Sequence, residues 1–535
     1  MATKCIRCLA RPSLPSSFLL NASSSLRIQS LPSTASMGNR YASKLARPNT
    51  NGPRKNEKVK GQKTLRIKKK PPPKTGKPPQ PGERKAMRKR IVLSNTNALE
   101  VPGMRELDKE LVGEWEKGIQ DARRHAEEGD WVLEGAMGMA AREGAKEGEA
   151  TNGEGVVRQV VALQGQTVDS LRAVEAFKTT QGWGLFRRPG LLIREESVML
   201  SRKLIQAEEG NLRLVIDGER GTGKSLLLLH AMATAFVRGW IVINIPEGES
   251  PLLIRWRLVA DTFGDVAQEV TNAMNDYAPL PNTNPTLYTQ PTYTATLLSR
   301  INKANPILAD MEISLTHSLP IPIQSNISLS RLCELGARDP DVAWPIFQAF
   351  WAELMAEGMP PVLLSLDGLS NIMRESMYLA PDTSKLHAHD LALVDHFVNY
   401  LSGERRLENG GAVLAATSRS HAPNSKSMEL VLKQLAEIQR GEEEITEKDP
   451  FEKSYDDRVE WALGVGPEKA IKAGPVEVLK LKGLSKKEAR GLMEYWAKSG
   501  VLRKRVDEKE VAEMWALAGN GVVAEIERGA LRMRI

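Results

Sequence analysis

The stretch Asn211–Gly239, NLRLVIDGERGTGKSLLLLHAMATAFVRG, decides the fold of this 535-residue chain. Its first seven residues form an apolar run, which predicts a strand buried on both faces of a parallel sheet. A glycine-rich turn follows, and the next sixteen residues predict a helix that begins directly at the turn. A strand, a glycine turn and a helix in this order are typical of phosphate-binding loops.

The turn, Gly218–Ser225, fits the pattern G-x-x-x-x-G-K-[ST]. Its glycines allow backbone N–H groups to converge on phosphate oxygens, and the start of the helix adds partial positive charge. In such loops the lysine reaches the β- and γ-phosphates and the next hydroxyl binds Mg²⁺, the roles expected for Lys224 and Ser225. The predicted nucleotide-binding residues of the turn are Gly218, Glu219, Arg220, Gly221, Thr222, Gly223, Lys224 and Ser225.

Three further apolar runs, over 240–246, 361–368 and 412–418, predict strands of the same sheet. Asp367 closes the second run and is the expected second protein ligand of the metal. Ser418 closes the third run, where related folds place a polar sensor of the γ-phosphate.

The residue after Asp367 is Gly368. Many ATPases carry a glutamate at this position, which polarises the attacking water, so its absence predicts slow hydrolysis at most, or a base from elsewhere. No catalytic residue is therefore assigned. The sequence lacks the guanine-reading pattern Asn-Lys-x-Asp, since Asn302–Asn305 (NKAN) has no acid. The residues leave GTP or GDP and ATP open as ligands.

Other conspicuous residues are assigned structural roles. His387, His389 and His396 lie on a stretch predicted to be helical and exposed, which argues against a metal site. Cys333 has no base nearby in the sequence and is expected in the core. The segment 275–296, rich in Asn, Pro and Thr, predicts a surface insertion.

The composition is that of a globular protein with a sizeable core, because 41% of the residues are apolar and 26% are charged. No apolar run reaches the roughly 18–20 residues of a membrane span. The charge is uneven. Residues 1–90 hold 23 Lys/Arg and two acids, a net +21, which leaves 51 basic and 64 acidic residues, a net −13, in 91–535. Such asymmetry indicates a nucleic-acid or targeting role for the basic arm.

The arm has two parts. Residues 1–56 contain no acid, nine Lys/Arg and many Ser, which favours a mitochondrial presequence over a secretory signal and predicts a matrix protein. Residues 57–90 hold 14 Lys/Arg around a proline-rich centre and cannot pack a core. They are either a solvated linker or an arm that neutralises RNA phosphates.

The predicted fold class is α/β, a P-loop NTPase-like parallel sheet flanked by helices, with a C-terminal helical lid and a disordered basic N-terminal arm. The lid follows from a purely helical pattern beyond an acidic stretch at 441–457. The predicted parts are a presequence at 1–41, a basic Pro-rich extended arm at 42–95, a helical extension and linker at 96–175, a nucleotide-binding domain at 176–440 and the lid at 441–535.

Four segments in this order, FKTTQGWGLFRRPGLLIRE, GERGTGKSLLLLH, WIVINIPEG and PVLLSLDGLS, resemble the mitochondrial ribosomal death-associated protein three family, in a fungal-type version. The similarity runs from about Ala176 to the C-terminus and omits the basic arm and 275–296. The resemblance implies a protein of the small-subunit head that contacts rRNA, neighbouring mitoribosomal proteins and the large subunit. It also implies a guanine nucleotide on the loop.

Two other hypotheses remain open. A matrix ATPase with a remodelling or signalling role requires the missing glutamate and an arginine from a neighbour, for which Arg419 is a candidate by position alone. An RNA-binding module with a vestigial loop is disfavoured because Lys224 and Ser225 are intact.

Overall fold

The computed structural model describes residues of the unit Pro79–Ile535. The predicted presequence, the basic arm, positions 118–157 of the predicted extension and linker, and positions 443–444 of the acidic stretch lie outside the described residues. The described residues are 99–117, 158–178, 181–247, 270–271, 275–281, 283, 285–324, 326–419, 425–442, 445–452, 454–464, 476–502 and 504–531.

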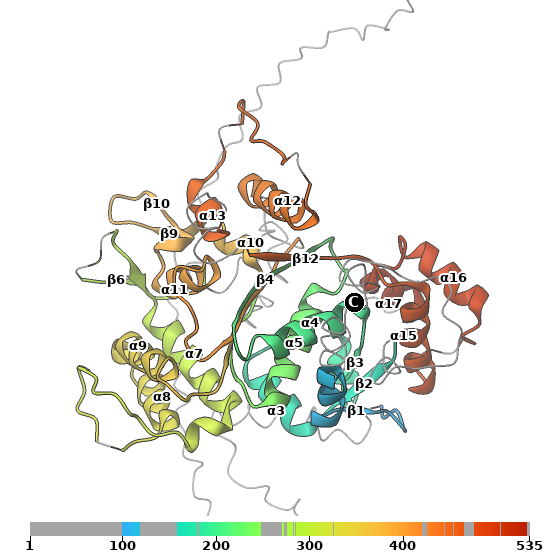
Figure 1. Ribbon diagram of the computed structural model, residues 1–535, viewed down its shortest axis with the longest axis horizontal. Coiled ribbons are helices and arrows are strands. Elements are labelled where there is room, and N and C mark those ends of the chain that lie inside the picture. Colours follow the sequence, from blue (N-terminus) through green and yellow to red (C-terminus); the bar gives the residue numbers. More distant parts are fainter. Residues whose placement is uncertain are drawn as a thin grey trace, which may run out of the picture. The chain divides into compact units, whose positions relative to one another are not determined.

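A five-stranded parallel sheet forms the centre of this unit, in the order β12-β4-β11-β8-β5 (Figure 1). The register aligns Ile216 with Ala416 and Ala416 with Asp367. The segments that follow β4, β11 and β8 therefore meet at one edge of the sheet. The prediction of four strands in this sheet is confirmed for β4 (Asn211–Gly218), β5 (Ile241–Ile245), β8 (Val362–Asp367) and β11 (Gly411–Ala416).

Helices cover both faces of the sheet, which is why its strands are apolar at almost every position. Successive side chains of a strand point to opposite faces. Accordingly Val215 packs in a core with α7–α9, α11 and α12, whereas Ile216 packs in a second core with α3–α5. The helices are α3 (Gly165–Ala173), α4 (Glu195–Gln206), α5 (Lys224–Arg238), α7 (Pro291–Ala304), α8 (Leu329–Arg338), α9 (Ala343–Leu354), α11 (Ala392–Leu401) and α12 (Lys426–Arg440).

The fifth strand, β12 (Glu477–Leu481), pairs with β4 at the edge of the sheet. The prediction that the chain is purely helical beyond 441–457 is therefore wrong. The strand escapes the apolar-run criterion because it is only partly buried: Leu481 is buried, but Lys480 is exposed and the rest is half-buried.

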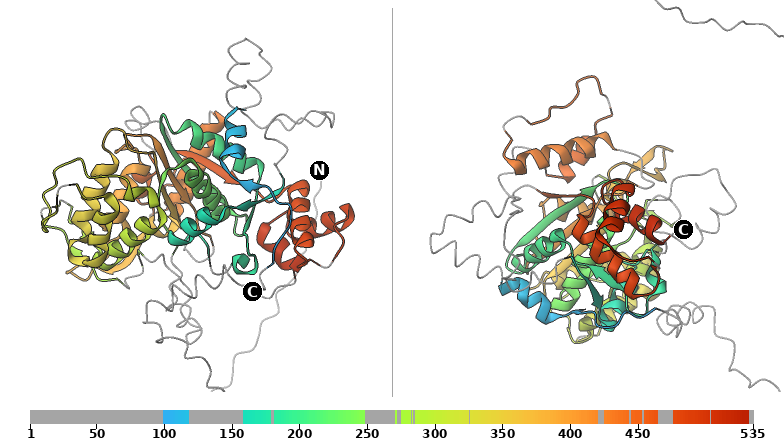
Figure 2. Two further views of the ribbon diagram at one scale, coloured as in Figure 1. Left: turned by 90° about the horizontal axis from the view of Figure 1, so that it is seen from below. Right: turned by 90° about the vertical axis from the view of Figure 1, so that its right-hand side faces the viewer.

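Three helices follow β12 and share a small core that also contains Val101. They lie together in both views of Figure 2, and α15 contacts β2 and β3. The strands β1, β2 and β3 form a separate three-stranded sheet. The elements are α15 (Lys486–Lys498), α16 (Glu508–Leu517), α17 (Val523–Leu531), β1 (Glu106–Leu107), β2 (Val160–Leu163) and β3 (Gly190–Leu192).

The prediction of a surface insertion is confirmed for the first part of 275–296, where 276–279 are exposed, but it is wrong for the part from Tyr288 onward. Tyr288 and Tyr293 are 7% and 1% exposed and belong to the main core. Pro291 occupies the first turn of α7, where a missing N–H costs nothing, so the proline starts a helix and does not mark a loop. The shorter elements are β6 (Ala278–Pro279), β7 (Tyr288–Thr289), β9 (Glu375–Leu379), β10 (Lys385–His387), α10 (Leu369–Ile372), α13 (Asp457–Ala462) and the 3₁₀ turns at 182–185, 306–309, 340–342 and 388–390.

The three histidines do not lie on an exposed helix, contrary to the prediction. His387 and His389 are each 8% exposed; His387 ends β10 and His389 lies in the 3₁₀ turn at 388–390. His396 in α11 packs edge-on against Trp351. Cys333 is fully buried in α8, as predicted, and burial raises the pKa of its thiol. No helix among the described residues is long and apolar enough to cross a membrane.

Candidate nucleotide-binding site

The glycine-rich turn connects β4 to the first residue of α5. Gly221 and Gly223 have φ angles of +79° and +99°, in the left-handed region that favours glycine. Gly223 is the N-cap of α5 and has no side chain to accept hydrogen bonds from the N–H groups of the first turn. A helix start of this kind is suited to phosphate oxygens, which supply both the acceptors and the negative charge.

Lys224 is buried at the base of this turn, with 8% of its surface exposed. Its Nζ donates to the carbonyl oxygens of Gly218 and Glu219, at 2.8 and 2.7 Å. Burial lowers the pKa of Lys224 to about 8, a shift that the nearby carboxylate of Asp217 only partly opposes. A buried ammonium whose charge is so incompletely balanced is stabilised by an anion.

The two predicted metal ligands line the same small cavity, Ser225 from α5 and Asp367 from the end of β8. Ser418 follows β11 at the same edge of the sheet, is 7% exposed, and accepts a hydrogen bond at its carbonyl from Ser370 Oγ at 2.9 Å. Its role as a phosphate sensor stays a prediction.

The donor set at the cavity fits Mg²⁺. The ion prefers oxygen ligands, usually one or two protein groups together with water and substrate phosphates, and the Ser225 hydroxyl and Asp367 carboxylate are such groups. Within the described ranges, no three His, Cys, Asp or Glu side chains gather as a metal site. A Mg²⁺ ion here would therefore be held by Ser225, Asp367 and the phosphates together, and it would neutralise phosphate charge.

Two charged residues of the cavity were not singled out in the sequence. The Lys178 Nζ lies 2.6 Å from Oε2 of Glu247 and 2.8 Å from Oδ2 of Asp367. Glu247 follows β5 just as Asp367 ends β8, and these two strands are neighbours. A search for acids at the carboxyl ends of predicted strands would have found Glu247, but the order of the strands is visible only in the fold.

Asp217, directly before the turn, is tied to the end of β11. Its Oδ1 accepts a hydrogen bond from Thr417 Oγ1 at 2.8 Å and lies 3.4 Å from the Arg419 guanidinium. Arg419, considered above as an arginine for a neighbouring subunit, thus pairs within its own chain.

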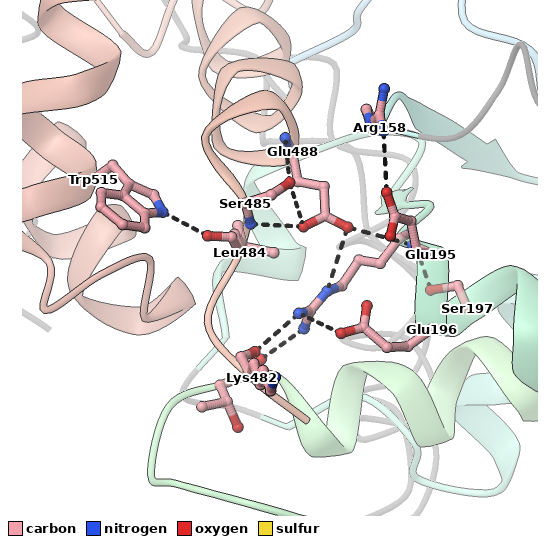
Figure 3. A network of polar contacts seen from close by, with 11 residues as sticks. Arg158, Glu195, Glu196, Ser197, Lys482, Leu484, Ser485, Glu488 and Trp515 are labelled. Carbon is pink, nitrogen blue, oxygen red and sulfur yellow. Dashed lines mark hydrogen bonds and ion pairs between the residues drawn. The ribbon is translucent and has the colours of Figure 1, made fainter. Parts of the chain in front are cut away.

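Arg194, also absent from the sequence predictions, links the turn to the C-terminal helices. Its side chain is 8% exposed, and it donates to the carbonyl oxygens of Thr222 and Lys482 at 3.1 and 2.9 Å. Its Nε lies 3.9 Å from Oε1 of Glu488, which also accepts from the backbone N–H of Glu195 at 3.3 Å. Figure 3 shows Glu488 reaching from α15 to the start of α4.

The start of α17 lies directly on the turn. The N–H of Ala524 donates to the carbonyl oxygen of Gly221 at 3.1 Å. A Cβ added at Gly221 would come within 3.0 Å of the Ala524 Cβ, so only a glycine fits there without displacement. The C-terminal helices therefore close one side of the candidate site.

A largely apolar cavity lies between the turn, the segment 181–197 and the C-terminal helices. The space free of atoms is about 960 Å³, and this figure includes the part that is open to solvent. Gly223 at the start of α5 forms part of its wall, so the cavity adjoins the candidate phosphate site. Leucines make up most of the rest of the lining, together with four aromatic side chains and one carboxylate: Trp183, Phe186, Tyr495, Trp496 and Glu527. We call this space the aromatic cavity.

The sequence matches the family described as "Mitochondrial ribosomal death-associated protein 3" over residues 191–255 and 265–529, more than half of the chain. It is also 43% identical to the "Small ribosomal subunit protein mS29" of Neurospora crassa over 541 aligned positions, covering 99% of this chain and 98% of the relative. Both matches run through 275–296, which the sequence resemblance had left out.

Proposed function

This chain belongs to the mitochondrial ribosomal death-associated protein 3 family, and on that basis we propose that it is a structural component of the mitochondrial small ribosomal subunit that binds a purine nucleotide with Mg²⁺. Its location is the mitochondrial matrix, reached through the presequence at 1–41. Its partners are the small-subunit rRNA, neighbouring proteins of the small-subunit head, and the large subunit.

The observation that carries nucleotide binding is the buried Lys224 at the base of a glycine turn that opens α5. The turn, the ammonium, the Ser225 hydroxyl and the Asp367 carboxylate supply donors, charge and metal ligands at one edge of the sheet. A ligand that binds only the folded protein stabilises it by about 2.7 kcal/mol at a hundredfold excess over Kd. Such a role requires the loop and does not require a strong catalytic base.

The base of the nucleotide is proposed to enter the aromatic cavity beside Gly223. Aromatic walls suit any purine, but the carboxylate of Glu527 favours guanine. Guanine presents two neighbouring N–H donors, at N1 and N2, to one carboxylate, whereas adenine offers no such pair. GTP or GDP is therefore the proposed ligand, with ATP as the alternative.

Hydrolysis is proposed to be slow at most. The residue directly after Asp367 is Gly368 and carries no carboxylate. Glu247, which packs against Gly368, is engaged by the Lys178 ammonium. A carboxylate held in an ion pair is a weak base, so the site favours retention of the nucleotide over turnover.

The test combines sedimentation with nucleotide analysis. The mature chain is expected to co-sediment with the mitochondrial small subunit in a sucrose gradient, and mass spectrometry of the purified protein is expected to detect a guanine nucleotide. Lys224→Ala should lose most of that nucleotide and the rise in melting temperature that added GDP gives the wild type. An equal nucleotide content in the variant would contradict the proposed site.

The runner-up is a matrix P-loop ATPase with a remodelling or signalling role. The intact Lys224 and Ser225 allow it, but the pairing of Arg419 with Asp217 of the same chain disfavours an arginine offered to a neighbour. A free pool of protein with robust ATP turnover, and no co-sedimentation, would favour this function instead.

A further inference from the structure

The ammonium of Lys178 lies between two carboxylates at the candidate metal site. Its Nζ is 2.6 Å from Glu247 Oε2 and 2.8 Å from Asp367 Oδ2. The three side chains come from separate places in the chain: Lys178 precedes the turn at 182–185, Glu247 follows β5, and Asp367 ends β8. They meet because β5 and β8 are neighbouring parallel strands whose carboxyl ends share one edge of the sheet.

This ion triplet is largely removed from water, since the side chains of Lys178, Glu247 and Asp367 are 20%, 13% and 11% exposed. Burial alone would lower the pKa of Lys178, but the two carboxylates more than reverse this effect and raise it, so the side chain is charged. Without the ammonium, two carboxylates would face each other in a poorly solvated place, which is costly.

The ammonium contacts the same carboxylate that a divalent cation would need. Asp367 lines one cavity with Ser225, the other expected metal ligand, and Lys178 lines that cavity too. Two cations on one carboxylate at such short distances repel each other strongly. Lys178 and Mg²⁺ therefore compete for Asp367, and Glu247 remains available as a partner for the lysine.

We propose that Lys178 is an internal counter-ion of the nucleotide site: it neutralises Asp367 in the absence of the divalent cation, and it transfers to Glu247 alone when Mg²⁺ binds with the nucleotide. This inference rests on the nucleotide site proposed above and adds a residue to it. Lys178 also lies close enough to Lys224 to act on its charge, so its positive potential reaches the phosphate-binding turn. The site consequently retains affinity for the nucleotide without Mg²⁺.

The experiment compares GDP binding to the full chain by calorimetry, in saturating Mg²⁺ and in EDTA. Wild type is expected to bind GDP in both conditions, and the ratio of its Kd in EDTA to its Kd in Mg²⁺ is expected to be modest. Lys178→Met should bind far more weakly in EDTA and nearly normally in Mg²⁺, which raises the ratio by about tenfold or more, the effect of one nearby unit charge. Lys203→Met is the matched control, because the Lys203 Nζ pairs with Glu477 at 2.6 Å outside the cavity.

The double variant Lys178→Met/Glu247→Gln removes the excess negative charge and guards against misfolding of the single variant. It should also show a raised ratio, though a smaller one than Lys178→Met, because Asp367 still lacks its counter-ion while the negative charge of Glu247 is gone. An unchanged ratio in both Lys178 variants, with GDP bound by wild type, would overturn the counter-ion role alone. Failure of wild type to bind GDP in either condition would instead overturn the nucleotide site, and this inference with it.

Discussion

Glu527 is the residue whose carboxylate is proposed to accept hydrogen bonds from the guanine base. It projects from α17 into the aromatic cavity, and one of its oxygens lies close to Gly182 on the opposite wall. Burial raises the pKa of Glu527, an effect that Arg528 partly opposes. Two N–H donors on a bound base would stabilise the ionised form, because charge-assisted, bidentate hydrogen bonds are the strong ones.

Glu527→Gln is expected to weaken GDP binding by about 10- to 100-fold, the usual cost of a bidentate contact to a base, and to leave ADP binding almost unchanged. Calorimetry with both nucleotides gives the ratio. Glu525→Gln is the control, since Glu525 lies on the same helix but is exposed and paired with Arg528. A GDP-to-ADP preference that survives Glu527→Gln would mean that another group reads the base.

At the scale of elements, the docking of α15 on β2 depends on a close approach of two backbones. Gly491 lies in the middle of α15, and a Cβ added there would meet the carbonyl oxygen of Arg158 at 1.9 Å. The same helix carries Glu488, which bonds to the start of α4 and approaches Arg194. A shift of α15 would therefore disturb the wall of the cavity as well as the contact itself.

Gly491→Ala is expected to destabilise the protein by about 2 kcal/mol or more, although alanine in a helix normally gains about 1 kcal/mol over glycine. Gly113→Ala is the control, because Gly113 is also helical and a Cβ there meets nothing within 4 Å. Urea unfolding of the two variants should give changes of opposite sign. Two changes of the same sign would show that α15 does not dock as described.

For the whole molecule, buried histidines make stability depend on pH. Burial lowers the pKa of His230 to about 4 and those of His389 and His396 to about 3. In the unfolded chain these rings gain a proton near pH 6.5, so between about pH 6.5 and 4 the unfolded state binds more protons than the folded state. The free energy of unfolding should therefore fall as the pH falls through this range.

His396→Phe is expected to flatten that fall by up to about 1.4 kcal/mol per pH unit. The Nε2 atom of His396 is buried without a hydrogen-bond partner and its ring packs on Trp351, so phenylalanine keeps the ring contact and removes the proton. Urea unfolding at several pH values from 7.5 to 4.5 measures the difference between the two proteins. Parallel curves would exclude a contribution from His396.

The basic arm gives the second prediction at this scale. Deletion of 57–90 removes 14 Lys/Arg and should weaken association with the small-subunit rRNA. It should also flatten the salt dependence of binding, because a protein that makes fewer phosphate contacts releases fewer counter-ions when it binds. Filter binding of the full and shortened chains across a salt series measures both effects. Equal slopes of affinity against salt for the two chains would indicate that residues 57–90 are a solvated linker and do not bind RNA phosphates.

Sequence alone determined four of the five strands of the central sheet, the glycine turn and the helix that follows it. These features are local: a strand buried on both faces is an apolar run, and a phosphate loop requires glycine, lysine and hydroxyl at fixed spacing. The same local criteria misjudged the later part of 275–296, where Pro291 begins α7, and overlooked β12, a half-exposed strand without an apolar run.

Tertiary structure decided the rest of the site. Lys178, Glu247 and Asp367 are separated by 69 and 120 positions, and only the neighbourhood of β5 and β8 brings them together. The aromatic cavity likewise joins 181–197 to the C-terminal helices. These long-range contacts cannot be read from the order of residues in the chain, because they depend on which strands become neighbours and where helices dock. Strand order and helix docking are determined by burial of the whole apolar core.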